Sequence, residues 1–151
     1  VSGELVELSV KEYAFFATFT RATWEGEPEF EATERPNAQL TRAFAEELGR
    51  CIGIEKPESL ALPALLDQLD DGGVDGRTVG ALRTGIGKAY IEPLCSGIKK
   101  ALEEAVGESV ARQYRISVVG RIRDGARKVP LYGLTLNPEQ IDFVESDKEA
   151  A

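Results

Sequence analysis

Apolar residues recur at every fourth position in the middle of the chain, which is the spacing of a helix with one buried face. The clearest such segment follows Pro36 and Asn37, a helix breaker and a helix-capping residue. On its polar side, Glu46 and Arg50 stand four residues apart, a spacing that favours an ion pair. We therefore predict an amphipathic helix that ends near Gly53. Its apolar row is Leu40, Phe44, Leu48 and Ile52.

Two further helices are predicted after this one, which gives a central group of three helices. The second is short and follows Ser59, and the third runs from about Thr78 to Val106. Proline removes a backbone N–H and clashes with the preceding helical turn, so we expect Pro93 to kink or split the third helix. The residues that we predict to form the core are Phe44, Leu48, Ile52, Leu65, Leu66, Leu69, Ile98 and Leu102.

The N-terminal region fits two interpretations, of which we favour a strand or hairpin. Val6, Leu8 and Val10 alternate with polar residues, which is the period of a half-buried strand. Residues 13–24 are rich in aromatic side chains and threonine, which favour strands. A turn after them would lead into a second strand over 29–34.

The alternative for the same region is a helix. Ser9 and Glu12 have the spacing of a capping box, in which each side chain bonds the backbone of the other residue. The residues that would share one face of that helix are Tyr13, Phe16, Ala17 and Thr20. The sequence leaves this alternative open.

Strand-like alternation returns near the C-terminus and predicts a β-hairpin. Along residues 115–123 the apolar row alternates with Arg115, Ser117, Val119, Arg121 and Arg123, and Asp124 with Gly125 is a turn signal. Residues 129–136 are predicted to form the return strand. We expect the apolar side of the first strand to cover the helices and its arginine side to face outward. The apolar side consists of Ile116, Val118, Gly120 and Ile122.

Strands that are separated along the chain from the helices are typical of the α+β class. We predict an α+β fold with an N-terminal strand or hairpin, a central group of three helices and a C-terminal β-hairpin. The 151 residues fit a single globular domain over 1–151, with 146–151 as a short polar tail.

Composition bounds the cellular setting. No apolar run approaches the roughly 18 residues of a membrane span, and the first residues lack the basic and apolar regions of a signal peptide. Val1 stands either at a processed start or at an alternative start codon, and the sequence leaves both open. Cys51 and Cys95 lie on apolar faces of predicted helices, so we expect two buried free thiols in a reducing compartment and a cytoplasmic protein without membrane contact.

The chain offers little catalytic chemistry. It contains no histidine, the commonest acid–base group and metal ligand. Residues 84–89 resemble a phosphate-binding loop, but Leu82 stands where a glycine is needed and Ala89 where a serine or threonine is needed. Residues 71–76 likewise resemble the start of a calcium loop but lack its later ligands. We therefore predict no catalytic, cofactor-binding or metal-binding residues, and we favour a non-enzymatic protein.

Charge is distributed unevenly along the chain, whose net charge is −8. Residues 1–75 carry 16 acidic and 6 basic side chains, whereas residues 76–151 carry 10 acidic and 12 basic ones. Such asymmetry bears on association rather than on fold. The candidate binding residues are the basic Arg115, Arg121, Arg123, Arg127 and Lys128 and the acidic Glu27, Glu29 and Glu31.

These residues suggest an interaction or assembly protein that forms homo- or hetero-oligomers through complementary charged strands. The basic residues would pair with the acidic ones, in the same chain or in a neighbouring copy. The alternative is a nucleic-acid-associated protein that uses the basic hairpin 112–128. We disfavour it because the chain as a whole is acidic. A third interpretation is a small enzyme that uses carboxylates and arginine.

Overall fold

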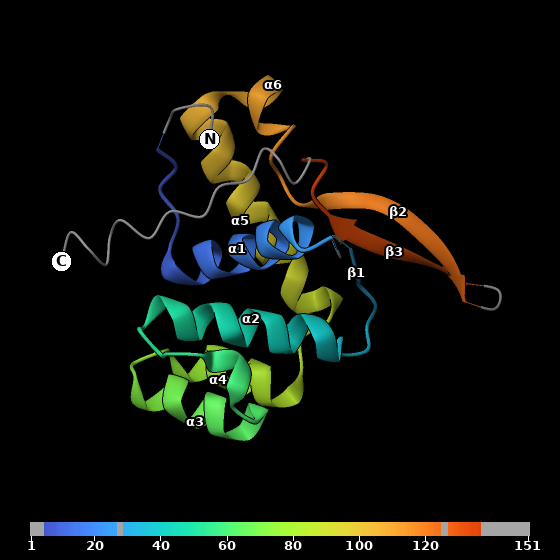
Figure 1. The fold of residues 1–151 in the computed structure, drawn as a ribbon. Helices are drawn as coiled ribbons and strands as arrows, with labels where there is room; N and C mark the ends of the chain where they lie inside the picture. The colour runs from blue at the N-terminus through green and yellow to red at the C-terminus, as the bar shows by residue number, and fades with distance from the viewer. Residues whose placement is uncertain (1–4, 27–28, 125–126, 137–151) are drawn as a thin grey trace.

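The computed structural model describes residues 5–26, 29–124 and 127–136, with the backbone alone at Asp124 and Arg127. Within these ranges the chain forms six helices, one 3-10 turn and a three-stranded antiparallel sheet (Figure 1). The predicted α+β class is confirmed. The helices are α1 (Val10–Trp24), α2 (Ala38–Cys51), α3 (Leu62–Asp71), α4 (Gly76–Thr84), α5 (Lys88–Val106) and α6 (Glu108–Ala111).

The N-terminal region is helical, so the hairpin that we favoured for it is wrong and the alternative is right. Ser9 caps α1 with a complete capping box, in which its side chain accepts from the Glu12 backbone N–H at 3.1 Å. The threonine hydroxyls that suggested a strand donate to carbonyls one turn back, as Thr18 does to Ala14 at 2.8 Å. Packing overrides strand propensity here, because α1 lies against α2 and α5 and buries several sides.

The face of α1 that we expected to be buried is only partly so. Tyr13 is 54% exposed, whereas Phe15 and Phe19 are fully buried. These two rings contact each other edge to face, with centroids 5.3 Å apart. The buried side of α1 therefore keeps Ala17 from the predicted stripe and adds Phe15 and Phe19, which the stripe omitted.

The helix after Asn37 forms as predicted. The Asn37 side chain accepts from the Leu40 backbone N–H at 2.9 Å and so caps α2. The 3-10 turn η1 (Pro57–Ser59) connects α2 to α3. Of the predicted core residues, Ile52 alone is only partly buried. The others, all buried, are Phe44, Leu48, Leu65, Leu66, Leu69, Ile98 and Leu102.

The third predicted helix is divided into α4 and α5, but the break lies at Gly85–Gly87 and not at Pro93. Gly85 adopts a φ of +96°, which side chains disfavour. The loop then runs against the segment after β1, where the Lys88 N–H donates to the Thr33 carbonyl at 2.7 Å. A Cβ atom at Gly87 would lie 2.9 Å from that carbonyl oxygen. The glycines that resemble a phosphate loop thus allow two backbone segments to pack closely.

The sheet consists of β1 (Phe30–Glu31), β2 (Ser117–Asp124) and β3 (Arg127–Gly133), in the order β1-β3-β2. β2 and β3 form the predicted C-terminal hairpin, and β1 lies within the segment predicted as a second strand. At the base of the sheet, Phe30 pairs with Tyr132 and both pack against the core. The far end of the hairpin projects away from the helices (Figure 1). No helix among the described residues has the length and apolar character needed to cross a bilayer.

A β-bulge at Val119 changes the faces of β2. Val118 pairs with Tyr132 and Gly120 with Leu131, so Val119 has no partner in β3. Since side chains alternate along a strand, the extra residue moves everything beyond it to the opposite face. The single apolar face that we predicted is therefore wrong. Val118 shares the face of Tyr132, and Ile122 lies on the other face, 40% exposed.

Candidate interaction surfaces

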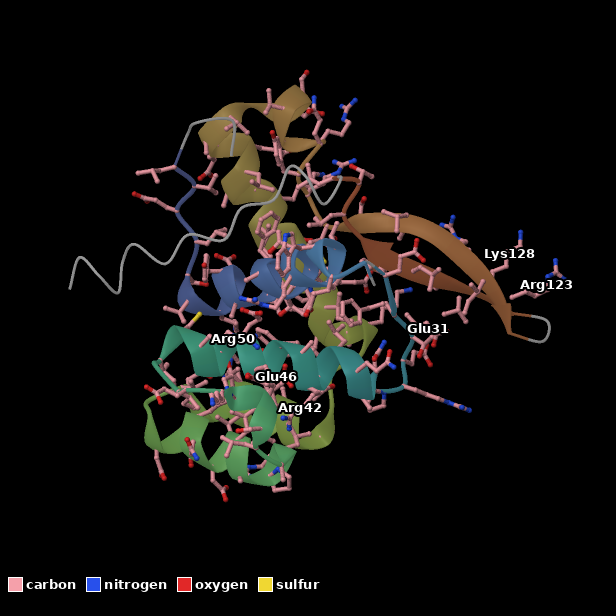
Figure 2. All side chains as sticks on the ribbon, viewed as in Figure 1. Glu31, Arg42, Glu46, Arg50, Arg123 and Lys128 are labelled. Atoms are coloured by element: carbon pink, nitrogen blue, oxygen red, sulfur yellow. The ribbon has the colours of Figure 1, made fainter. Side chains whose placement is uncertain are left out.

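The arm, defined here as residues 120–124 and 127–131, carries the exposed basic side chains Arg121, Arg123 and Lys128. Directly opposed residues of antiparallel strands share a face. Arg123 opposes Lys128 and Arg121 opposes Pro130, so the three cations lie on one face of the arm. Figure 2 shows Arg123 and Lys128 near its tip, beyond the helices.

The remaining predicted basic residues lie differently. Arg115 is partly buried in the turn between α6 and β2, at the base of the hairpin rather than on the arm. The Arg127 backbone pairs with Asp124, while its side chain is outside the described part of the chain. Three of the predicted basic residues therefore lie together on the arm, and Arg115 lies apart from them.

Glu31, one of the predicted acidic partners, lies on the opposite face of the sheet. Glu31 opposes Leu131, which in turn opposes Gly120, and this row alternates with the row of Pro130 and Arg121. Glu29, two residues before Glu31, is exposed as well. Glu27 falls outside the described residues. Among the described side chains, no ion pair joins these carboxylates to the arm.

A cleft of about 460 Å³ lies between α1 and α2, next to β1. It was not foreseen from the sequence. Its bottom and sides include small residues such as Ala22 and Ala43, and three arginines and four glutamates surround them. The charged lining residues are Arg21, Arg42, Arg50, Glu25, Glu29, Glu46 and Glu47.

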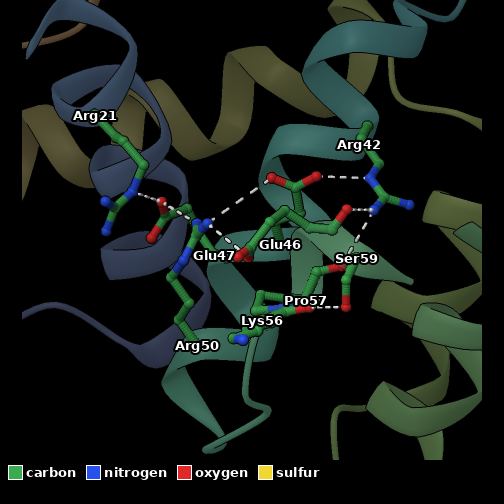
Figure 3. Close-up of polar contacts among 9 residues, drawn as sticks. Arg21, Arg42, Glu46, Glu47, Arg50, Lys56, Pro57 and Ser59 are labelled. Atoms are coloured by element: carbon green, nitrogen blue, oxygen red, sulfur yellow. Dashed lines mark hydrogen bonds and ion pairs between the residues drawn. The ribbon is translucent and has the colours of Figure 1, made fainter. Parts of the chain in front are cut away.

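The three arginines of the cleft all have carboxylate partners (Figure 3). The Glu47 side chain is only 5% exposed and accepts from Arg21 Nε and, at 2.8 Å, from an Arg50 terminal nitrogen. A buried carboxylate would be costly without such partners. The Arg42 Nε donates to Glu46 at 2.6 Å. The predicted Glu46–Arg50 pair is present at 4.0 Å, but Glu47 is the nearer partner of Arg50.

Arg42 also connects α2 to the η1 turn. Its terminal nitrogen donates to the carbonyls of Pro57 and Glu58, each at 3.1 Å. With these bonds and the one to Glu46, most of its donors point into the protein. The guanidinium groups of the cleft therefore serve the protein's own structure and leave little positive charge for a ligand.

The end of the cleft near β1 keeps unpaired negative charge. Glu25 and Glu29 line it and are exposed, and none of the ion pairs among the described residues includes either of them. Glu31 follows two residues later along the same segment. The cleft thus has an acidic mouth beside a neutralised interior.

The sequence contained only part of the signal for this site. The i,i+4 spacing of Glu46 and Arg50 was visible, and so was the excess of glutamate between α1 and α2. The Arg21–Glu47 pair spans 26 positions, and no local pattern indicates it.

The two thiols differ, which corrects one prediction. Cys51 is exposed at the end of α2 rather than buried, and Cys95 is partly buried; both are free. Burial, together with the nearby Glu92 carboxylate, raises the pKa of Cys95 to about 12. Partial desolvation and the Glu47 carboxylate raise the pKa of Cys51 as well.

Comparison with known proteins found no matching family model, no matching curated protein and no matching solved structure. Across the described ranges, no group of three or more histidine, cysteine, aspartate and glutamate side chains could hold a metal ion. Two charged surfaces are therefore the candidate functional features of the described residues, namely the arm and the acidic mouth of the cleft.

Proposed function

We propose that this protein is a non-enzymatic assembly protein whose arm makes electrostatic contacts with a second copy or with another protein. The observation that carries the proposal is the basic face of the arm. Three cations project beyond the helices, and none of them pairs with a described carboxylate of its own chain. We further propose that assembly takes place in the cytoplasm, where free thiols such as Cys51 and Cys95 persist.

Such contacts select a partner more than they add affinity. One exposed ion pair contributes about 0–1 kcal/mol, but several pairs across an interface fix register and exclude wrong partners. The arm also exposes Ile122, which is 40% accessible and which a partner could cover. Apolar contact would then contribute affinity, while the charged contacts would determine the partner and its orientation.

The test is the mass in solution of the wild-type chain and of two doubly substituted chains. Arg121→Glu with Arg123→Glu reverses charge on the arm. Lys99→Glu with Lys100→Glu makes the same change in net charge on the exposed side of α5 and serves as control. We expect the wild type and the control to assemble and the arm variant to remain a folded monomer, as measured by light scattering and circular dichroism.

Salt gives an independent check. The screening length falls from about 10 Å at 0.1 M salt to about 3 Å at 1 M, which weakens contacts between exposed charges. We expect the wild-type assembly to dissociate over this range. A wild-type mass that neither salt nor the arm substitutions change would contradict the proposal.

A second candidate function is nucleic-acid binding, and the shape of the arm favours it. A two-stranded β-ribbon fits the major groove of a duplex, and its cations would contact phosphates. Against it, the net charge is −8, and the described residues of the arm include no aromatic side chain on which a base could stack. Binding of a duplex or single strand that falls steeply with salt and is lost in the arm variant, while the mass is retained, would move the assignment to this function.

A further inference from the structure

We infer that the cleft between α1 and α2 receives the arm of a second copy of the chain, so that copies join head to tail. This inference rests on the proposed assembly function and names its receptor. The partner is then another copy of the chain, and the contact joins two different surfaces, the arm of one copy and the cleft of the other.

Charge complementarity is the first support. The three cleft arginines already pair with Glu46, Glu47 and Glu58. Glu25 and Glu29 at the mouth of the cleft have no cationic partner among the described residues. The arm presents the reverse, namely cations without carboxylates. Arginine binds carboxylate in a bidentate geometry, so carboxylates along this segment suit an arm with Arg121 and Arg123.

The shape of the cleft is the second support. Small side chains, including Ala22 and Ala43, leave an open volume of about 460 Å³. This volume lies within the range of about 300–1,000 Å³ typical of sites for small ligands. Long basic side chains from a narrow ribbon can enter a cleft of this size.

The arm cannot fill the cleft of its own chain. Its cations lie on the sheet face opposite Glu31, and its tip points away from α1 and α2 (Figure 2). The contact must therefore join two copies. Because the two contacting surfaces differ, the interface is heterologous and repeats until it closes a ring or extends as a filament.

The experiment uses two charge-reversed variants, one altered on the arm and the other at the mouth of the cleft. The arm variant is Arg121→Glu with Arg123→Glu, and the cleft variant is Glu25→Lys with Glu29→Lys. A second cleft variant, Ala43→Phe, obstructs the cleft without a change of charge. Each variant alone should weaken self-association by about tenfold or more, since like charges oppose or the space is filled.

The mixture of the arm variant with Ala43→Phe, whose cleft is blocked and carries no new charge that could attract the reversed arm, gives the decisive result. The first retains an intact cleft and the second an intact arm, so one interface can form between them. We expect a 1:1 heterodimer that does not grow further, as measured by sedimentation. Glu92→Lys with Glu104→Lys, on the exposed side of α5, matches the charge change of the cleft variant and should assemble like the wild type.

The possible outcomes distinguish a failure of arm-to-cleft docking from a failure of the assembly function on which it rests. Should the arm variant be monomeric while both cleft variants assemble normally, the arm docks elsewhere; the inference fails and the assembly function stands. Two monomeric variants that form no heterodimer would also overturn the inference. If the wild type is monomeric at all salt concentrations, both fail. If a basic peptide or a nucleic acid binds to the arm or the cleft of this monomeric wild type, that molecule occupies the surface in place of a second copy.

Discussion

The protein has two groups of arginines with opposite surroundings. In the cleft, Arg21, Arg42 and Arg50 each contact a carboxylate of the same chain, and Glu47 between two of them is nearly buried. On the arm, Arg121 and Arg123 are exposed, and neither pairs with a described carboxylate. The first group joins α1, α2 and η1, and the second group is available to a partner.

This difference shows that the number of charges in a segment does not determine their role. Helices place residues four apart side by side, so α2 could provide glutamates for its own arginines. A two-stranded arm has only its facing strand for partners, and Arg123 opposes Lys128 there. Like charges in direct opposition are destabilising, so this pair costs the arm stability unless a partner of the kind proposed neutralises it.

The largest expected effect compares apolar contacts in the helices and on the arm. Leu48 is 1% exposed and lies in the core cluster, so Leu48→Ala should destabilise the fold by about 2–5 kcal/mol. Ile122→Ala on the arm is the control and should change stability by less than about 0.5 kcal/mol. Chemical denaturation measures both. Equal losses would show that the arm is packed as tightly as the helices.

A smaller effect is expected from glycines in the same two regions. Gly85→Ala places a Cβ atom 2.6 Å from the Pro36 Cβ at a φ of +96° and should cost about 1–3 kcal/mol. At Gly120 on the arm, a Cβ atom would meet Leu131 at 3.7 Å, an ordinary contact. Gly120→Ala should leave the melting temperature unchanged or raise it. A harmless Gly85→Ala would disprove the close packing of the 84–88 loop.

The charged groups themselves should show a still smaller difference in stability. Glu47→Gln removes the carboxylate that Arg21 and Arg50 share and should cost about 1–2 kcal/mol, the lower part of the range for bonds to charged groups. We place it low because those arginines keep about 30% of their surface in water. Glu31→Gln, at an exposed carboxylate, should have no measurable effect. Urea titrations of the two variants test the contrast.

The thiols provide a comparison that does not perturb the fold. Because the pKa of Cys95 is raised to about 12, very little thiolate forms at neutral pH and this residue should react slowly. Cys51 is exposed, so it should react at least about tenfold faster, and both rates should increase with pH as thiolate forms. Labelling followed by mass spectrometry distinguishes the residues. Cys51→Ser should remove the fast phase alone, and loss of the slow phase instead would reverse the assignment.

Much of the helical part could be predicted because its signals are local. The α2 cap at Asn37, the four-residue apolar row and the capping box at Ser9 all depend on neighbours within one turn. The preference for strand over 13–24 failed because aromatic and threonine residues also suit a helix that is buried on several sides. The strand propensity of these residues carries no information on how many other elements pack against α1.

The candidate site was less predictable because it depends on long-range geometry. The alternation of 115–123 was correct as a pattern, but the bulge at Val119 reversed its outcome beyond that residue. The helix break at Gly85 could not be predicted, because it depends on the packing of residues 33–37 against the loop. The cleft arose from a pair between Arg21 and Glu47, in helices whose contact the sequence did not reveal.

The pairing of β1 with β3 has a consequence for the order of events during synthesis. Phe30 and Tyr132 lie about 100 residues apart along the chain, yet they hold the base of the arm and the mouth of the cleft together. Ribosomes add about 5–20 residues per second, so β1 waits for several seconds until its partner strand emerges. Nascent chains therefore lack both the anchored arm and the completed cleft. If copies join as we propose, assembly can begin only after translation has passed β3.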